Sequence, residues 1–385
     1  MKIIYFTTAI QRDDYKDFTK LWKISLNPSN QNFHNKMIRS LAINNEVEVI
    51  SVRPFSRRFC KVKKLEEEIK KEGNITWHYI PIKGNRLTRP FYIKNAVKKA
   101  LKSLDLTNAI FLSDTINPNV ITNANRAHKK YHNPLCGIIT DSPSNISGTG
   151  RSYTLYLLKQ GQHLDGYISL TEGLNDMFNE DNKPYMIMEG IVEDIESKVT
   201  KNEKYGNYFF FGGALLERYG IYNLISAFNR LSKEDIKLII CGHHGDERKL
   251  KESFNGNPNI VYLKMLPVKE VLNFEAGALA NINPRPYSQD LDKFSIPSKT
   301  IEYYTSGRLT ISAKSTILEN HFKNCTIWCN YAKEDELLLA MQKALKMDED
   351  KRIMMGIEAK EKAKELYSLT SINKKLDEFL IQFIK

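Results

Sequence analysis

Short apolar runs alternate with amphipathic segments along almost the whole chain. This alternation is typical of strands and helices that build parallel α/β layers. In the first half we expect strands at residues 2–7, 47–52, 75–82, 109–112, 136–140, 166–170 and 185–188. Helices are expected at residues 92–104 and at residues 32–44, where Phe33, Met37 and Leu41 share one face.

The same alternation restarts after a polar stretch at residues 193–207, which we interpret as a domain linker. Beyond it we expect strands at residues 208–211, 237–241, 260–263, 279–283, 309–311 and 326–328, and helices at residues 221–231, 334–346, 350–367 and 371–384. The sequence therefore predicts an α/β chain with two doubly wound, Rossmann-like domains whose ligand crevices face one another across a cleft. We place the domains at residues 1–195 and 205–365, and expect a C-terminal helix at residues 366–385 to pack back on the first domain.

The composition is that of a folded globular protein. Of 385 residues, 42% are apolar and 26% are charged, which excludes disordered and collagenous chains. No apolar window is long enough to span a membrane, and residues 1–10 indicate a buried strand rather than a signal peptide. The five cysteines form no CxxC pair, which argues against a disulfide framework or a zinc site and favours the cytoplasm.

Positive charge is concentrated in one part of the chain. Residues 51–100 hold fourteen Lys and Arg against four Glu, a net of +10, while residues 151–200 hold four against nine Asp and Glu, a net of −5. Phe55, Phe59 and Phe91 lie among the cations. This combination fits a solvated basic face or a surface that docks on an anionic membrane, and the lack of a known nucleic-acid-binding module disfavours nucleic acid.

Several common cofactor motifs are missing. The first strand ends in Thr7, Thr8 and Ala9 instead of GxGxxG, and no GxxxxGK[ST] occurs. A nicotinamide, flavin or P-loop site is therefore not predicted, and we expect no cofactor. His243 and His244 are adjacent but lack a third ligand, so we expect no metal.

The run from Phe294 to Arg308 is the most informative motif. Pro297 is expected to open a helix that Gly307 closes, because proline fits a first helical turn. Amides near Ser298 and Lys299, with the helix dipole and the Lys299 ammonium, would make a site for a diphosphate. Glu302 follows one turn later and can accept hydrogen bonds from a ribose diol. The motif thus predicts a nucleotide site.

These residues resemble the retaining GT-B glycosyltransferases of family 4. The resemblance covers nearly all of residues 207–330, and it is weaker in the first half. It implies that the second domain binds a nucleoside diphosphate sugar and the first an acceptor. The donor site it implies consists of Gly212, Gly213, Arg218, Gly242, Pro284, Arg285, Ser298, Lys299 and Glu302. For catalysis it implies Lys299, Arg218 and Asp141, without a metal.

Two positions depart from the family pattern. The first of its two carboxylates is replaced by Phe294, and its basic pair falls on Ala214 and Tyr219, with Arg218 alongside. Three functions stay open: a transferase that moves a sugar, most readily from a UDP-sugar, to a glycan or lipid-linked oligosaccharide in cell-surface polysaccharide synthesis; a sugar-nucleotide epimerase; and a silent subunit that binds a partner. The oligomeric state is not predicted.

Overall fold

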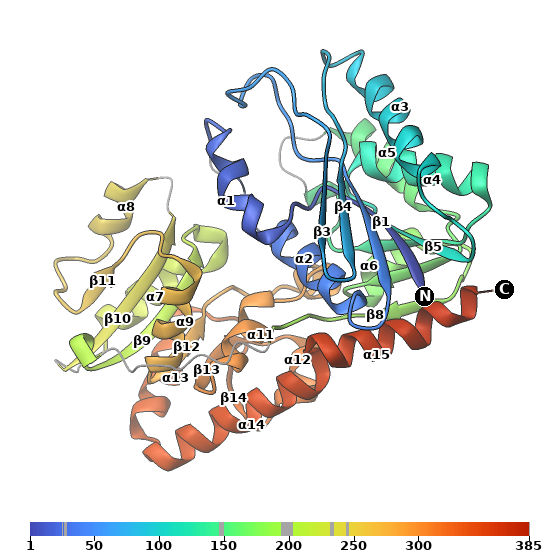
Figure 1. Ribbon diagram of the computed structural model, residues 1–385. Coiled ribbons are helices and arrows are strands. Elements are labelled where there is room, and N and C mark those ends of the chain that lie inside the picture. Colours follow the sequence, from blue (N-terminus) through green and yellow to red (C-terminus); the bar gives the residue numbers. More distant parts are fainter. Residues whose placement is uncertain are drawn as a thin grey trace. The chain divides into compact units, whose positions relative to one another are not determined.

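The computed structural model describes residues 1–24, 26, 29–145, 150–193, 203–231, 235–243 and 246–384. The chain forms two compact units (Figure 1). Unit 1 contains Met1–Glu193, Lys293–Ser295 and Leu369–Lys385, and unit 2 contains Asp194–Asp292 and Ile296–Ser368. Most of the expected linker, residues 194–202, lies outside the described residues.

The sheet of unit 1 has the strand order β3-β4-β2-β1-β5-β6-β7-β8. These strands are β1 (Lys2–Thr7), β2 (Glu46–Ser51), β3 (Glu68–Glu72), β4 (Ile75–Tyr79), β5 (Ala109–Asp114), β6 (Leu135–Ile139), β7 (Gly166–Ser169) and β8 (Tyr185–Ile187). All neighbours are parallel except β3, which pairs with β4 in the antiparallel sense. The order reverses between β1 and β5, where a doubly wound sheet has its ligand crevice.

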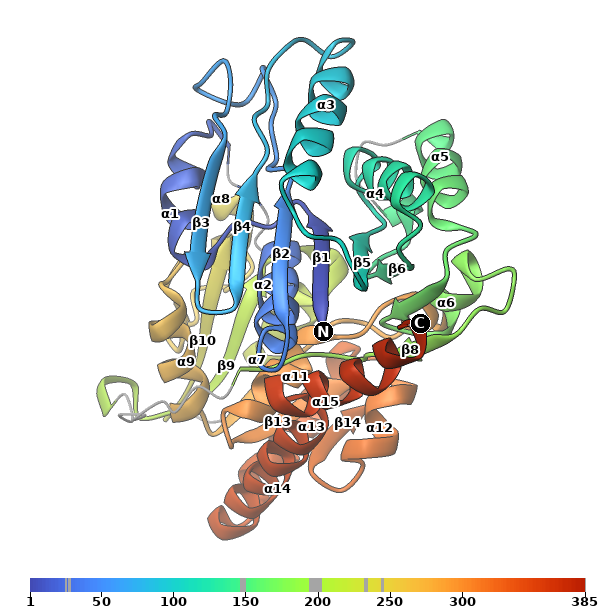
Figure 2. The same cartoon turned by 45° about the vertical axis from the view of Figure 1, so that its right-hand side comes forward.

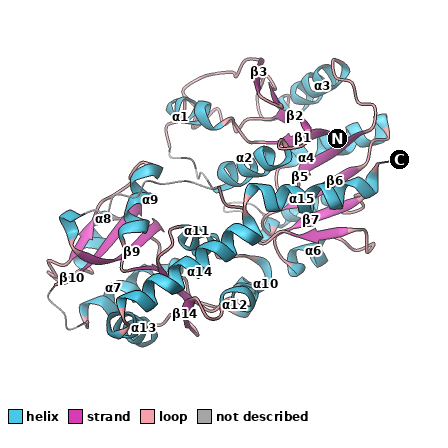
Figure 3. Ribbon diagram, turned by 60° about the horizontal axis from the view of Figure 1, so that its bottom comes forward, coloured by secondary structure: helices cyan, strands magenta, loops and turns pink. Residues whose placement is uncertain are grey.

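Helices pack along this sheet (Figures 2 and 3). They are α1 (Arg12–Lys20), α2 (Ser29–Leu41), α3 (Arg89–Lys102), α4 (Pro118–Tyr131), α5 (Arg151–Gly161), α6 (Glu172–Phe178) and, from the far end of the chain, α15 (Leu369–Leu380). Consecutive β1 residues Ile3, Ile4 and Tyr5 are all buried, which requires cover on both faces of the sheet.

Strand β3 was not predicted from the sequence. It reads Glu-Ile-Lys-Lys-Glu at the sheet edge, and even Ile69 is exposed. An exposed edge strand needs no apolar run, because only one of its sides pairs and neither of its faces is covered. Its charged side chains suit an edge that must not pair with another chain.

The sheet of unit 2 is entirely parallel, with the order β11-β10-β9-β12-β13-β14. Its strands are β9 (Asn207–Ala214), β10 (Ile236–His243), β11 (Ile260–Tyr262), β12 (Ala280–Asn283), β13 (Leu309–Ala313) and β14 (Thr326–Cys329). Its helices are α7 (Ile221–Asn229), α8 (Glu247–Glu252), α9 (Val268–Gly277), α10 (Gln289–Phe294, ending in unit 1), α11 (Ser298–Thr305), α12 (Thr316–Phe322), α13 (Glu334–Lys346) and α14 (Glu349–Tyr367).

Side chains of β9 alternate between two apolar clusters. Phe209 and Phe211 join the cluster on one face, and Tyr208 and Phe210 join the cluster on the other. The strand order reverses between β9 and β12, so unit 2 also has the doubly wound arrangement. The α/β class with two Rossmann-like domains, expected from the sequence, is therefore confirmed.

The chain returns to unit 1 between Ser368 and Leu369. Helix α15 then packs on α2: Ser40 Oγ donates to Leu369 O at 2.7 Å, and Asn45 Nδ2 donates to Asp377 Oδ1 at 2.8 Å. Leu376 is fully buried in the core of unit 1. Within the described part of the chain, no helix combines the length and the apolarity that a membrane crossing requires.

Replacing Leu376 should destabilise unit 1. Leu376→Ala removes a fully buried side chain and leaves a cavity, at a cost of about 2–5 kcal/mol. Urea unfolding of this variant should show an early loss of unit 1, while Lys374→Ala, an exposed neighbour, should unfold like the wild type. Equal midpoints for both variants would mean that α15 does not stabilise the unit.

Candidate functional site

The carboxyl ends of β9, β10 and β12 meet at one edge of the unit 2 sheet. Gly242 at the end of β10 is in register with Gly213 of β9. Strand β12, on the other side of β9, ends at Asn283 and leads directly into Pro284. The sequence-predicted glycines and the Pro284 loop are therefore gathered at the switch point of the sheet.

Two glycines allow backbones to approach one another at this edge. Gly242 has φ +146°, and a Cβ there would lie 1.8 Å from the carbonyl oxygen of Gly213. Gly220, just before α7, has φ +77°, and its Cβ would lie 1.9 Å from Pro284 O. Any side chain at either position would collide with main chain, so both positions require glycine.

Buried polar groups fix α11 on the sheet. Asn283 Nδ2 donates to Thr300 Oγ1 at 2.7 Å, and Thr300 Oγ1 lies 2.9 Å from Ser312 Oγ on β13. Tyr303 contacts β9, since its hydroxyl accepts from Gly212 N at 3.0 Å. These contacts set the place of the helix that carries the predicted phosphate and ribose ligands. Arg285, half-buried, follows Pro284 at the same edge.

The start of α11 differs from the prediction. The first helical residue is Ser298, and Pro297 occupies the preceding cap position. The Ser298 amide donates to Ile296 O at 2.9 Å, because the chain turns tightly before the helix. The Ser298 amide is therefore not free for an anion, which corrects that part of the expected phosphate site, while the Lys299 ammonium still lies at this end of α11.

Lys299 lies between two carboxylates. Its Nζ is 2.9 Å from Glu302 Oε2 and 3.8 Å from Glu275 Oε1. Its Cε would be 4.0 Å from a Cβ on Gly213, so the side chain lies over the end of β9. Burial alone would lower the pKa of Lys299, but the carboxylates of Glu302 and Glu275 outweigh it and raise the pKa. The ammonium is thus held charged at the glycine-rich edge.

Sequence reasoning missed Glu275. It lies on α9 with no exposed surface, and the nearby charge of its carboxylate also raises the pKa of the Tyr303 hydroxyl, to which burial contributes most. A glutamate in the apolar stretch Phe274 to Ala280 is unusual, because a buried charge needs a partner. A charged residue in an apolar stretch could have marked Glu275 in the sequence, but only the structure shows that Lys299 is its partner.

Arg218 is the second cation expected at the diphosphate. It is exposed in a short 3-10 turn, Glu217–Tyr219, with its guanidinium 5.0 Å from the Tyr219 ring centroid. Among the described residues, no recorded contact joins Arg218 to Lys299. The structure therefore brings Gly212, Gly213, Gly242, Lys299 and Glu302 together, and places Arg218 two residues before the Gly220 turn.

Phe294, which replaces the first family carboxylate, has a packing role. The segment Lys293–Ser295 belongs to unit 1, where Phe294 packs against the apolar core. Thr171 Oγ1 donates to Lys293 O at 2.7 Å, and Gly173 leaves room for the Lys293 backbone and side chain. An apolar side chain at position 294 is thus explained by the way this short segment is anchored.

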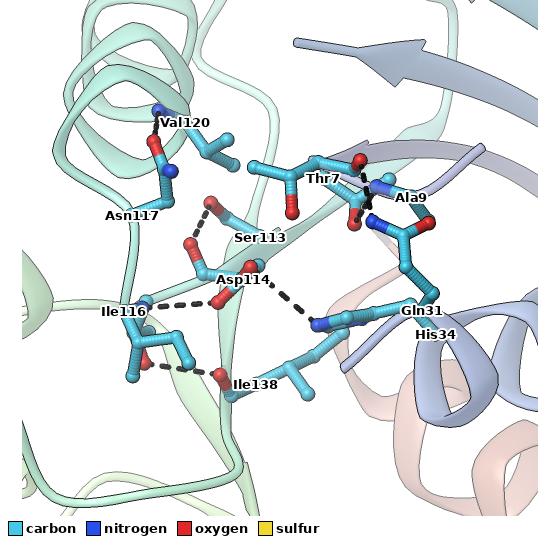
Figure 4. A network of polar contacts seen from close by, with 12 residues as sticks. Thr7, Ala9, Gln31, His34, Ser113, Asp114, Ile116, Asn117, Val120 and Ile138 are labelled. Atoms are coloured by element: carbon cyan, nitrogen blue, oxygen red, sulfur yellow. Dashed lines mark hydrogen bonds and ion pairs between the residues drawn. The ribbon is translucent and has the colours of Figure 1, made fainter. Parts of the chain in front are cut away.

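Unit 1 has a polar cluster of its own at the switch point between β1 and β5 (Figure 4). His34 on α2 and Asp114 at the end of β5 are both buried, with His34 Nε2 3.5 Å from Asp114 Oδ2. His34 Nδ1 lies 2.7 Å from the Tyr5 hydroxyl, and Asp114 Oδ1 accepts from Ile116 N at 3.0 Å. Asp114 was missed because the predicted strand stopped at residue 112.

Asp141, the predicted sugar contact, follows β6 in unit 1. It is half-buried, and its Oδ1 accepts from the Ser142 amide at 2.8 Å. This bond orders the turn after the strand, a common role for an aspartate at such a position. Among the described residues there is no cluster of three or more metal-ligating side chains. His244 lies outside those residues.

Comparisons with known proteins identify the fold. No protein-family signature matches the sequence, and no curated protein matches it significantly. Trehalose-6-phosphate synthase OtsA is similar to this chain in structure, with a TM-score of 0.71, 13% identity and 99% of each chain covered. A sucrose-phosphate synthase from Thermosynechococcus elongatus gives a TM-score of 0.69 at 11% identity, again with 99% of each chain covered.

A third similar structure is Anabaena Alr3699/HepE, solved in complex with UDP. Its TM-score is 0.65 at 12% identity, over 99% of this chain and 100% of that chain. These proteins are GT-B glycosyltransferases. The chain therefore has the GT-B fold over essentially its whole length, which confirms the expected resemblance at the level of the fold.

The pairing of Lys299 with the buried Glu275 predicts a stability effect. Lys299→Met removes the ammonium 3.8 Å from a fully buried carboxylate; because Lys299 itself is about one-third exposed, the cost should be below the roughly 3–5 kcal/mol typical of a fully buried pair. Adding Glu275→Gln should recover most of this cost, because the buried negative charge is then absent as well. Urea unfolding of the single and double variants measures the coupling.

Lys269→Met, an exposed lysine on α9, is the control and should leave unfolding unchanged. Because the folded state raises the pKa of Lys299, the stabilisation should be complete below the ordinary lysine pKa and fade as the pH rises above it. A stable Lys299→Met protein, or a double variant no more stable than the single one, would contradict the pairing.

Proposed function

We propose that this protein is a retaining glycosyltransferase that transfers a hexose from a UDP-sugar to a hydroxyl acceptor. The observation that carries the proposal is the placement of Lys299 and Glu302 on α11, beside the glycine-rich ends of β9 and β10. A cation beside the half-buried Gly213, which has no side chain to block a close approach, suits a diphosphate, and a carboxylate one turn later suits a ribose diol. The fold shared with structures solved with UDP supports the same proposal.

The chemical task is to stabilise the negative charge that develops on the departing diphosphate. Lys299 is held charged by its neighbours and lies on a helix fixed by Asn283 and Tyr303, so little reorganisation is needed. Losing one such preorganised group commonly costs about 3 kcal/mol in the transition state. Arg218, close in sequence to the Gly220 turn, is the second candidate cation.

The remaining steps need few further protein groups. The departing phosphate takes the acceptor proton, which matches retention of anomeric configuration, and Asp141 of unit 1 is the candidate contact to sugar hydroxyls. Since Lys299 supplies positive charge to the diphosphate, we propose that turnover does not depend on a metal or on another cofactor. A silent subunit would bind the nucleotide without turnover, and an epimerase would change the sugar without needing an acceptor.

The donor site predicts distinct effects for its two ligands. Glu302→Ala should weaken binding of both UDP and uridine, because the proposed carboxylate contact is to ribose. Lys299→Met should weaken binding of UDP alone, because its contact is to phosphate. Calorimetric titration of each variant with both ligands makes the comparison. Glu270→Gln, an exposed change on α9, is the control. Unchanged affinities in both variants would refute these roles.

The acceptor is proposed to be a lipid-linked oligosaccharide used in cell-surface polysaccharide synthesis. Support comes from the start of α3, where Leu87 is 89% and Phe91 63% exposed. The same part of the chain carries exposed cations on α3 and on the segments before it: Arg57, Arg58, Lys61, Lys63, Lys64, Lys83, Arg86, Lys94, Lys98 and Lys99. Apolar side chains within a basic surface complement an anionic bilayer, which would hold unit 1 at the cytoplasmic membrane face.

The exposure of the apolar side chains decides which of them can anchor such a contact. Phe55 and Phe59 are half-buried, and guanidinium groups lie over their rings: Arg89 is 4.8 Å from the Phe55 centroid and Arg58 is 5.1 Å from that of Phe59. The Arg89 side chain also donates to Phe55 O, which joins α3 to the loop after β2. Leu87 and Phe91 are therefore the better anchors.

Membrane docking predicts two losses of liposome binding. Reversing Arg57, Arg58, Lys61 and Lys64 to Glu should abolish co-sedimentation with anionic liposomes, and Leu87→Ser with Phe91→Ser should weaken it. Both variants should keep UDP affinity. Binding should also fade with salt, because exposed charges are screened over about 10 Å at 0.1 M.

The matched control reverses four exposed lysines of unit 2: Lys343, Lys346, Lys351 and Lys360. This control should still co-sediment. If the wild type ignores anionic liposomes at low salt, or if both quartets have the same effect, the basic surface of unit 1 is only a solvated face and the acceptor is a soluble glycan.

A further inference from the structure

The two carboxylates beside Lys299 differ in how far their side chains are exposed and can move. Glu302 lies on the same helix as Lys299 and is about one-third exposed, whereas Glu275 lies on α9 with no exposed surface. Both are close enough to attract the ammonium. Only Glu302 can turn toward a ligand in solvent, since a fully buried side chain has no room to follow one.

The main chain around Glu275 is held in place. Asn281 Nδ2 donates to the Glu275 carbonyl oxygen at 3.0 Å, and Arg308 Nε donates to Ala276 O at 2.5 Å. These bonds attach the end of α9 to β12 and to the segment before β13. The Glu275 side chain is therefore fixed in position, while the Lys299 side chain reaches from it toward Gly213.

Binding of a nucleotide would change the contacts of Lys299. In the proposed donor site, Glu302 binds ribose and must give up some or all of its contact with Lys299. A lysine left without a partner would sample several rotamers, and ordering such a side chain costs free energy. Glu275, which cannot turn toward the ligand, remains as the second carboxylate beside the ammonium.

We infer that Glu275 is a positioning residue, whose buried carboxylate holds the Lys299 ammonium in place for phosphate while Glu302 turns to the ribose. This inference rests on the proposed function. Glu275 itself touches no substrate. Its effect should therefore be confined to ligands that carry phosphate, which separates it from a residue that only stabilises the fold.

The test compares UDP with uridine. Glu275→Gln keeps the shape of the side chain and removes its charge, so UDP affinity should fall about tenfold while uridine affinity stays unchanged. Glu275→Asp keeps the charge and should recover most of the UDP affinity. Calorimetric titration gives both constants, and thermal melting of each variant reports whether the fold is intact. Glu270→Gln makes the same chemical change at an exposed position of α9 and should alter neither affinity.

The outcomes separate this inference from the proposed function. If the wild type binds no UDP, the proposed function fails and this inference fails with it. If the wild type binds UDP and Glu275→Gln binds it equally well, only the role of Glu275 is wrong. A parallel loss of UDP and uridine affinity with a lower melting temperature would make Glu275 a structural residue, and a well-folded Glu275→Asp protein without recovery would also overturn the inference.

Discussion

A buried negative charge on α9 constrains the whole carboxyl edge of the unit 2 sheet. Glu275 has no exposed surface, so an opposite charge must reach it from a neighbouring element, and Lys299 does so at 3.8 Å. This pairing requires α11 to begin beside β9, where Tyr303 contacts Gly212 and Thr300 joins β12 to β13. The same constraint leaves the ammonium between the buried carboxylate and the glycine-rich edge.

Backbone geometry completes this edge. The strands could not end so close together with side chains at Gly242 or Gly220, because a Cβ at either position meets a carbonyl oxygen. The edge places the half-buried Gly213 beside the Lys299 ammonium, and a cation next to a position without a side chain suits phosphate. Unit 1 has an analogous switch point but fills it with a buried His34 and Asp114 pair, so the two units offer different chemistry on related frameworks.

The sequence predicted regular, buried elements well. The α/β alternation predicted the core strands and helix α13, since buried strands and amphipathic helices have distinct apolar periods. It missed β3, whose charged residues have no apolar period because the strand is exposed. Lys299 and Glu302 could be proposed from local spacing. Glu275 could not, because its partner is 24 positions away and depends on how α9 and α11 pack. The hydrogen bond from the Ser298 amide could not be predicted either, because it depends on the turn at Ile296.

The central claim is that the edge formed by Lys299, Glu302 and the glycines serves sugar transfer from a nucleotide. Release of free UDP is the most direct measurement, with the wild-type protein incubated with a panel of UDP-sugars and membranes that carry lipid-linked glycans. The account predicts release from at least one sugar donor, dependent on the acceptor and persisting in excess EDTA. Tight UDP binding without release from any donor would contradict the claim and leave a nucleotide-binding subunit instead.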